Sequence, residues 1–203
     1  MPSKFIATAE MNDYIFDIGK YVLKETCRQT SIWNDKYNKK LTASINLSPK
    51  EFNKKELIPL IDSTLKEFNF SPDLLIIEIT ENTFLNKNIN QIKEIKKRGI
   101  KISIDDFGTG YSSLSYLHKY DVDCIKIDKS FVWDINNDSQ KRILSNSIIS
   151  LANNLNLDIV TEGVEKEEEL KFFTDKHCDK FQGYYFSKPL SKNDFEKFII
   201  NNI

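Results

Sequence analysis

The stretch ISIDDFGTGYSSL, Ile102 to Leu114, begins with the alternation of a strand and places two adjacent carboxylates where that strand should end. A Gly-Thr-Gly turn follows Asp105 and Asp106. A strand-end acid taken alone is more often a helix cap or a turn former than part of a binding site. The meaning of this pair therefore depends on whether other strands carry polar residues at the same place.

Strand-like and helix-like segments alternate along the chain, which predicts a parallel sheet flanked by helices in one α/β domain over residues 1–203. Asn12 or Asp13 is expected to cap the first helix, and Gly99 to end the third. The predicted strands are 41–48, 74–80, 101–107, 124–128, 158–164 and 181–186. The predicted helices are 11–36, 54–68, 88–98, 112–120, a long helix after 138, one after 165 and a last helix to 203.

Two architectures fit this alternation, an open doubly wound sheet and a TIM-like (β/α) barrel. The open sheet would be expected to carry a Gly-rich phosphate turn after its first strand, and this sequence has none there. The barrel is therefore favoured, with six βα units visible. A filled barrel has eight strands, so we expect the first two to be missing, with the domain N-terminally truncated and Met1 an internal methionine.

Each predicted strand has one apolar face and one strongly polar residue on its other face, near its C-terminal end. In a barrel these residues would converge at the C-terminal mouth, where barrel enzymes keep their chemistry. One such residue would be unremarkable, but six on successive strands, about one βα unit apart, favour a shared site. They are Asn46, Glu78, Asp105, Lys126, Glu162 and Gln182.

The polar ring is rich in acids. Glu78, Asp105, Asp106 and Glu162 would repel one another around the single Lys126 unless a cation neutralised them. Oxygen ligands of this kind suit Mg²⁺ or Mn²⁺ rather than zinc. Two cations bridged by adjacent carboxylates would suit phosphoester hydrolysis, one activating water and both stabilising charge on the phosphate.

Composition argues against other classes of function. The 29 basic and 30 acidic residues give a net charge of −1, and the absence of a basic block argues against a nucleic-acid polymer as partner. The longest acidic run, Glu165 to Glu169, is expected to be a solvated helix start. The three cysteines are far apart, which predicts neither a disulfide framework nor a zinc site. With no apolar run of membrane-spanning length and no signal pattern, we expect a cytoplasmic chain without membrane contact, although an upstream region could be membrane-bound.

Six motifs follow one another along the chain: INLS, EITE, DDFGTGYSSL, KIDKSF, TEGVE and QGYYFSKPL. In this order they resemble the EAL domains, the cyclic di-GMP phosphodiesterases of bacterial signalling. The resemblance extends from about residue 2 to residue 190. It implies a TIM-like barrel that hydrolyses cyclic di-GMP to linear pGpG with Mg²⁺ or Mn²⁺.

The resemblance also implies roles for individual residues. Lys126 would hold the catalytic water and act together with Glu162 as the catalytic pair. Asp128 and Gln182 would contact the substrate. The implied metal ligands are Asn46, Glu78, Asp105, Asp106 and Glu162.

The loop that begins with the two aspartates has implied roles of its own. Glu81 would anchor this loop, and the 105–120 region would take part in homodimer formation and in control of the site. Gly108 and Gly110 would give such a loop its mobility.

Some features of the family are not found. An early strand of EAL domains carries a Glu-x-Leu motif whose Glu is a further metal ligand, followed by a substrate-binding Arg, and an earlier strand carries a Gln-Pro pair. We therefore expect this chain alone to be weak or inactive as an enzyme. Two alternatives remain, a degenerate module that binds cyclic di-GMP or a protein without hydrolysis, and another Mg²⁺-dependent barrel enzyme. The start of the chain instead resembles the family pattern P-x-x-F-I-x-x-A-E, which comes after the Glu-x-Leu strand. The matching residues are Pro2, Phe5, Ile6, Ala9 and Glu10.

Overall fold

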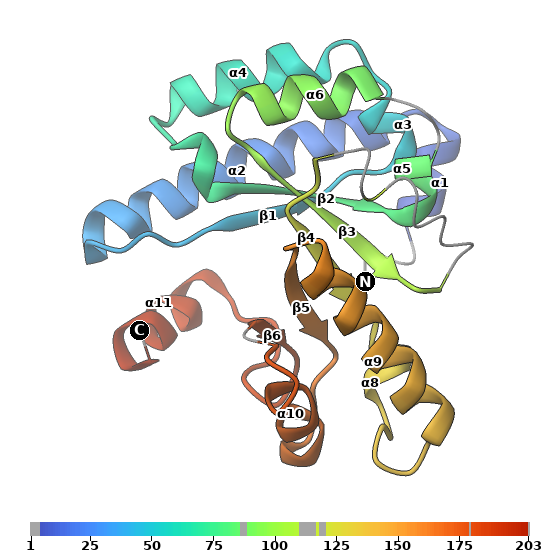
Figure 1. The fold of residues 1–203 in the computed structure, drawn as a ribbon. Coiled ribbons are helices and arrows are strands. Elements are labelled where there is room, and N and C mark those ends of the chain that lie inside the picture. Colours follow the sequence, from blue (N-terminus) through green and yellow to red (C-terminus); the bar gives the residue numbers. More distant parts are fainter. Residues whose placement is uncertain (1–4, 86–88, 110–116, 118–120, 179, 203) are drawn as a thin grey trace. The chain divides into compact units, whose positions relative to one another are not determined.

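A computed structural model describes residues 5–85, 89–109, 117, 121–178 and 180–202. Six strands follow one another in the sheet in the same order as in the sequence, which is the strand order of a (β/α) barrel (Figure 1). The pairs β1–β2, β2–β3 and β5–β6 are parallel. The strands are β1 (Ala43–Asn46), β2 (Leu75–Thr80), β3 (Lys101–Phe107), β4 (Cys124–Ile127), β5 (Asp158–Glu162) and β6 (Lys180–Gln182).

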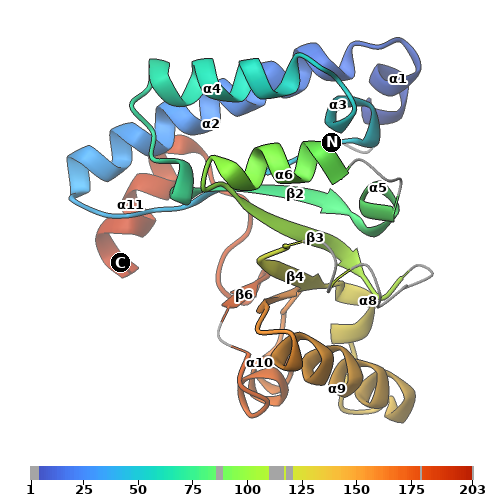
Figure 2. The same ribbon diagram turned by 45° about the horizontal axis from the view of Figure 1, so that its top comes forward.

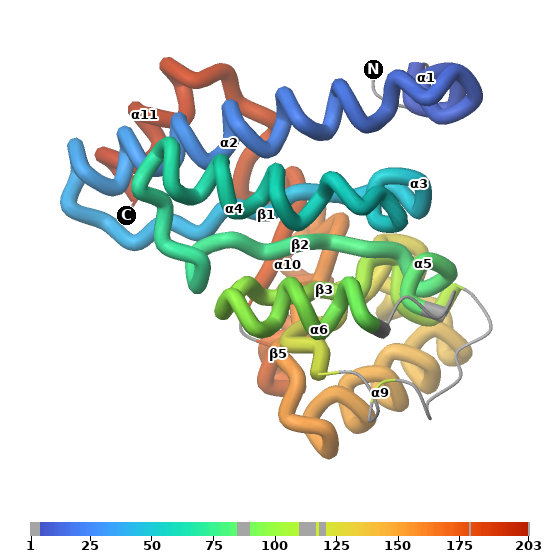
Figure 3. The backbone as a smooth tube through the Cα atoms, turned by 90° about the horizontal axis from the view of Figure 1, so that it is seen from above, coloured from blue at the N-terminus to red at the C-terminus, as the bar shows by residue number. Residues whose placement is uncertain are grey.

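The chain divides into two compact units, the first formed by Met1–Asp105 with Ser112–Cys124 and the second by Asp106–Tyr111 with Ile125–Ile203. In the first unit, helices α2 (Ile15–Tyr37), α4 (Leu57–Glu67) and α6 (Ile89–Lys97) lie side by side along one face of its strands (Figure 3). The core between these layers is fully buried and mostly aliphatic. It includes Ile45, Ile61, Ile77, Ile95 and Ile102. The shorter helices are α1 (Ile6–Met11), α3 (Pro49–Phe52) and α5 (Glu81–Leu85).

In the second unit, α8 (Lys129–Val132) and α9 (Ser139–Asn154) pack on each other and on β5 (Figure 2). Helices α10 (Glu167–Thr174) and α11 (Lys192–Asn202) complete this unit. Its core contains Ile125, Ile127, Val132, Ile159 and Phe173. The three cysteines are buried and none of them is in a disulfide, and burial raises the pKa of the Cys27 thiol to about 11. Within the described ranges, none of the helices combines the length and the apolarity needed to cross a membrane.

The first predicted helix, 11–36, is wrong at its start. Helix α1 ends at Met11, and α2 begins only after Tyr14, which is its N-cap. Asn12 instead closes α1, where its side-chain amide donates a hydrogen bond to the carbonyl of Thr8 (3.1 Å). Asp13 has a φ of +59°, a left-handed conformation that breaks the chain between the two helices. The polar pair therefore ends one helix rather than starting the next.

The remaining strand and helix boundaries show which sequence signals predict the structure well. All six strands and the Gly99 helix stop are confirmed, and Gly99 has the left-handed φ (+80°) expected after a helix. The predicted strand 181–186 ends instead at Gln182, because the amides of Phe186 and Ser187 donate back to the Gly183 carbonyl in a turn. The short helices α1, α3, α5 and α8 were not predicted. The predicted helix 112–120 lies almost wholly outside the described residues.

The sequence predicts that the acidic run Glu165 to Glu169 is solvated, and this prediction is wrong for its last residue. Glu169 is only 2% exposed, and its carboxylate accepts hydrogen bonds from the backbone amides of Glu165 (2.9 Å) and Lys166 (3.1 Å). It thus satisfies amide groups at the start of α10, which have no partner within the helix.

A close approach between α2 and α3 leads to a first prediction. A Cβ at Gly19 would lie 1.7 Å from Oε1 of Glu51, a buried carboxylate that also accepts a hydrogen bond from the Ser48 amide (2.9 Å). Gly19→Ala should therefore displace this carboxylate and lower the free energy of unfolding by about 1–3 kcal/mol, measured by urea denaturation. The matched control is Gly19→Ala combined with Glu51→Ala, in which the two effects should not add. Full additivity would contradict the contact.

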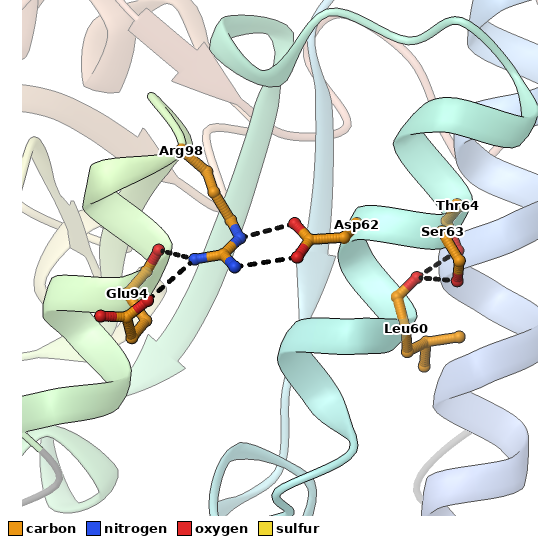
Figure 4. Close-up of polar contacts among 6 residues, drawn as sticks. All are labelled: Leu60, Asp62, Ser63, Thr64, Glu94 and Arg98. Atoms are coloured by element: carbon orange, nitrogen blue, oxygen red, sulfur yellow. Dashed lines mark hydrogen bonds and ion pairs between the residues drawn. The ribbon is translucent and has the colours of Figure 1, made fainter.

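A second prediction concerns Arg98, which joins α6 to α4. Its Nε and Nη2 donate to the two carboxylate oxygens of Asp62 (2.6 and 2.8 Å), and its Nη1 donates to the Glu94 carbonyl (2.6 Å) (Figure 4). The hydrogen bonds from Arg98 lower the pKa of Asp62, so this pair stabilises the fold at neutral pH and ceases to do so as the pH falls through that lowered pKa.

Arg98→Lys removes the bidentate fork. Because half of the Asp62 side chain is exposed, solvent screening limits the expected loss at pH 7 to about 0.5 kcal/mol. The loss should shrink in acid, where Asp62 is protonated in both proteins. Urea denaturation at several pH values measures this loss, with Lys66→Ala at an exposed position of α4 as control. A loss that grew on acidification would contradict the ion pair.

Candidate metal and catalytic site

The first unit brings the polar residues at the ends of β1 and β2 together. Asn46 and Glu78 are partners in the register of these parallel strands, and the Leu47 amide donates to the Glu78 carbonyl (2.9 Å). The predicted alternation in β1 is confirmed, with Ala43 and Ile45 buried and Asn46 exposed. Glu78 is buried at 7% exposure. Two of the predicted metal ligands therefore lie at neighbouring positions on adjacent strands.

The adjacent carboxylates of the opening stretch belong to an acidic cluster. Asp106, its chain neighbour Asp105 and Glu162 each offer an oxygen, and these atoms all lie within 4.8 Å of one another. Consecutive residues of a regular strand point to opposite faces. Asp106 departs from this rule because its φ is +53°, a conformation that is uncommon for residues other than glycine. This turn of the backbone lets both aspartates contribute to one cluster.

Lys126 and Glu162 form a buried ion pair in the second unit. The Nζ of Lys126 lies 2.5 Å from Oε1 of Glu162, and the two side chains are 5% and 17% exposed. A buried ammonium group is costly unless a carboxylate compensates its charge, and Glu162 provides one. The pair therefore fixes the ammonium group beside the acidic cluster.

Gln182 lies next to Glu162 in the register of β5 and β6. Both residues line a pocket of about 600 Å³ in the second unit. The pocket also has aromatic walls and a mixture of charges, which is typical of sites for polar molecules that carry flat rings. Its other lining residues include Lys129, Trp133, Glu165, Tyr184, Lys188, Phe195 and Phe198.

Asp128, a predicted substrate contact, has a local structural role. Its carboxylate accepts a hydrogen bond from the Ser130 amide (2.9 Å) and caps the N-terminus of α8. This is the usual role of an aspartate that follows a strand. A contact with substrate remains a prediction for this residue.

Glu81 is buried at 6% exposure, and neither of its carboxylate oxygens has a hydrogen-bond partner among the described residues. Leaving a buried carboxylate without partners carries a high cost in free energy. The loop that Glu81 is predicted to anchor continues into 110–116, which lies outside the described residues.

Sequence reasoning missed the aromatic wall of the pocket. Trp133 comes directly after α8, and Phe195 and Phe198 belong to α11 with their rings stacked at 6.4 Å. Strand periodicity identifies residues on strands only, so it could not place these side chains. The nearest available signal was the position of Trp133 five residues after the strand-end Asp128.

Comparison with known proteins gives consistent matches. The profile of the EAL domain family matches residues 1–189. The signalling protein YkoW of Bacillus subtilis is 42% identical over 204 residues, and the match covers 98% of this chain and 25% of YkoW. The cyclic di-GMP phosphodiesterase NbdA of Pseudomonas aeruginosa is 32% identical, with 98% and 26% covered. The chain thus spans about a quarter of the length of these curated relatives.

Solved structures match as well. The phosphodiesterase MucR of Pseudomonas aeruginosa, solved in complex with cyclic di-GMP, has a TM-score of 0.93 at 34% identity, with 96% of this chain and 80% of that chain covered. The EAL enzyme Bd1971 has the same TM-score at 29% identity, with 98% and 56% covered. These likenesses confirm the predicted fold class, α/β with the arrangement of a TIM-like barrel.

Proposed function

The chain belongs to the EAL domain family, and from this premise we propose that it is part of a metal-dependent phosphodiesterase that hydrolyses cyclic di-GMP to linear pGpG. The observation that carries the proposal is the cluster of Asp105, Asp106 and Glu162, with the buried Lys126 paired to Glu162. Clustered acids beside one fixed ammonium group are suited to phosphoester hydrolysis. The choice of cyclic di-GMP as substrate is supported by the similar structure of MucR, which was solved in complex with cyclic di-GMP.

The side chains of the site fit a hard divalent cation. Carboxylate and amide oxygens are the donors that Mg²⁺ and Mn²⁺ prefer, and the described acidic cluster contains neither histidine nor cysteine. Bound Mg²⁺ or Mn²⁺ supplies an activated water and stabilises charge on the phosphate. The structure of Klebsiella pneumoniae BlrP1 with calcium and cyclic di-GMP supports a divalent cation in the family. The residues that would hold the cations are Asn46, Glu78, Asp105, Asp106 and Glu162.

Different residues of the chain would then orient the attacking water and bind the substrate. Lys126, held by Glu162, would orient the attacking water through its ammonium group. Gln182, on the pocket wall, and Asp128, at the end of β4, would bind the dinucleotide. The pocket offers flat aromatic surfaces for its bases.

Control of the site is proposed to involve the loop after Asp106. The buried carboxylate of Glu81 supports the anchor role, because buried carboxylates normally accept hydrogen bonds and neither oxygen of Glu81 accepts one from the described residues. We also propose a homodimer through the 105–120 region, on the resemblance to the family. Sedimentation of the protein with and without cyclic di-GMP would test this assembly.

The amount of turnover separates this proposal from its alternative. The sequence has no Glu-x-Leu motif on an early strand to complete the ligand set, so we propose weak turnover by the 203 residues alone. The alternative is a module that binds cyclic di-GMP without hydrolysis.

Nucleotide chromatography after incubation with cyclic di-GMP and Mn²⁺ distinguishes the two. Slow formation of pGpG that Asp105→Asn combined with Asp106→Asn abolishes would support hydrolysis. The control pair, Asp17→Asn with Asp35→Asn, removes the same charge from exposed positions on α2 and should leave turnover unchanged. An unchanged substrate would support the binding module, and fast turnover would contradict the expected weakness.

A further inference from the structure

Trp133 is joined to the backbone just after Glu162. Its indole Nε1 donates a hydrogen bond to the Gly163 carbonyl (2.9 Å), and its own amide donates to the Lys129 carbonyl (3.0 Å). The carbonyl of Trp133 accepts a hydrogen bond from Nζ of Lys141 (2.8 Å). The side chain is therefore held at both its backbone and its ring, although Trp133 is 41% exposed and lines the pocket.

The turn that Trp133 holds has little freedom. Gly163 has a φ of +69°, a left-handed conformation, and a Cβ there would lie 2.4 Å from the Cβ of Lys129 and 3.4 Å from Nε1 of Trp133. The backbone at the end of β5 thus packs directly against α8 and the indole ring. Any movement of the ring would be passed to the Gly163 carbonyl, and from there to the preceding residue.

That preceding residue is Glu162, which pairs with Lys126 (2.5 Å) and belongs to the acidic cluster. Its side chain is fixed by the ion pair, whereas the hydrogen bond from Trp133 fixes the backbone that carries it. Lys129 also places its Nζ 5.3 Å from the centre of the Trp133 ring, a cation–π distance that helps to orient the indole.

We propose that Trp133 is a positioning residue, which holds Glu162 in the geometry needed for cation binding through the Gly163 carbonyl. This inference rests on the proposed function, since it concerns the same site. Residues that orient metal ligands typically change metal affinity by about 10- to 100-fold when they are replaced. Because the indole acts through the backbone, its contribution depends on the N–H group and not only on the volume of the ring.

The test measures Mn²⁺ binding by electron paramagnetic resonance in the 203-residue chain. Trp133→Phe removes the N–H donor and should weaken Mn²⁺ binding about 10-fold. An isosteric benzothienylalanine at the same position keeps the ring volume without the donor and should weaken it equally. Trp33→Phe, at the other tryptophan of the chain, should bind Mn²⁺ like the wild type.

Further readouts separate positioning from a purely structural role. The midpoint of thermal unfolding of Trp133→Phe should stay within about 4 °C of the wild type, the size of shift expected in a chain of this length when one hydrogen bond is lost. In the Trp33→Phe background, Trp133 is the single tryptophan, and its emission should change when Mn²⁺ is added. Wild-type Mn²⁺ affinity in the isosteric variant, or a loss of affinity matched by unfolding, would overturn the inference. Absence of Mn²⁺ binding by the wild type would overturn the proposed function as well, and is seen before any variant is compared.

Discussion

Lys126→Met should lower the free energy of unfolding by about 3 kcal/mol in the absence of divalent cations, because it removes the buried ammonium group that is paired with the Glu162 carboxylate. The nearby Asp105 and Asp106 carboxylates would add repulsion. Added Mn²⁺ should recover part of the loss, since a bound cation supplies positive charge to the same carboxylates. The weak turnover proposed for the wild type should be lost in this variant even with Mn²⁺, because the ammonium group that orients water has been removed.

Urea denaturation with chelator and with Mn²⁺ measures both parts of this prediction. Lys171→Met, which removes an exposed lysine from α10, should change neither value by more than about 0.5 kcal/mol. Lys126→Met combined with Glu162→Leu should cost less than the sum of the single changes, because each single change already removes the same ion pair. A loss below about 1 kcal/mol in chelator would show that the pair is not held as described.

Gly183→Ala should have a comparable effect for a different reason. A Cβ at this position would lie 2.0, 2.4 and 2.7 Å from the carbonyl oxygen, the amide nitrogen and the carbonyl carbon of Val164. These are backbone atoms, which cannot rotate away as a side chain can. The Val164 amide donates to the Gln182 carbonyl (3.2 Å) and the Val164 carbonyl accepts from the Tyr185 amide (2.9 Å), so both hydrogen bonds should be lost.

We expect Gly183→Ala to lower the free energy of unfolding by at least about 3 kcal/mol and to displace Gln182 from its place beside Glu162. The matched control is Gly99→Ala, because Gly99 also has a positive φ but a Cβ there would meet nothing within 4 Å. Backbone strain alone should cost that variant about 1 kcal/mol. Thermal and urea unfolding of the two variants would compare them. Equal losses would show that the approach of Val164 is not what requires glycine at position 183.

The period-two pattern predicted the strands, and which residues share a face of each strand, because it reflects alternation along the backbone, which is a local property. Asn46 and Glu78 are register partners, as are Glu162 and Gln182, and Lys126 is buried against an acid. The same pattern could not show that Asp106 turns into a left-handed conformation, which brings two consecutive side chains into one cluster.

Contacts between segments that are distant in sequence were also beyond the pattern. The hydrogen bond from Trp133 to Gly163 joins residues thirty positions apart, and the burial of Glu51 against Gly19 joins α3 to α2. Asn12 illustrates a different difficulty, because an asparagine between two helices can close the first or open the second. Only the packing of the flanking helices decides between these roles.

The central claim is that the acids at the strand ends bind a divalent cation and, through it, cyclic di-GMP. Calorimetric titration of cyclic di-GMP into the 203-residue chain tests it most directly, in excess Ca²⁺ and again in chelator. The account predicts binding in Ca²⁺ that weakens at least about 10-fold in chelator and that Asp105→Asn with Asp106→Asn abolishes in Ca²⁺. Binding of equal strength in both conditions, unaffected by the two substitutions, would contradict it.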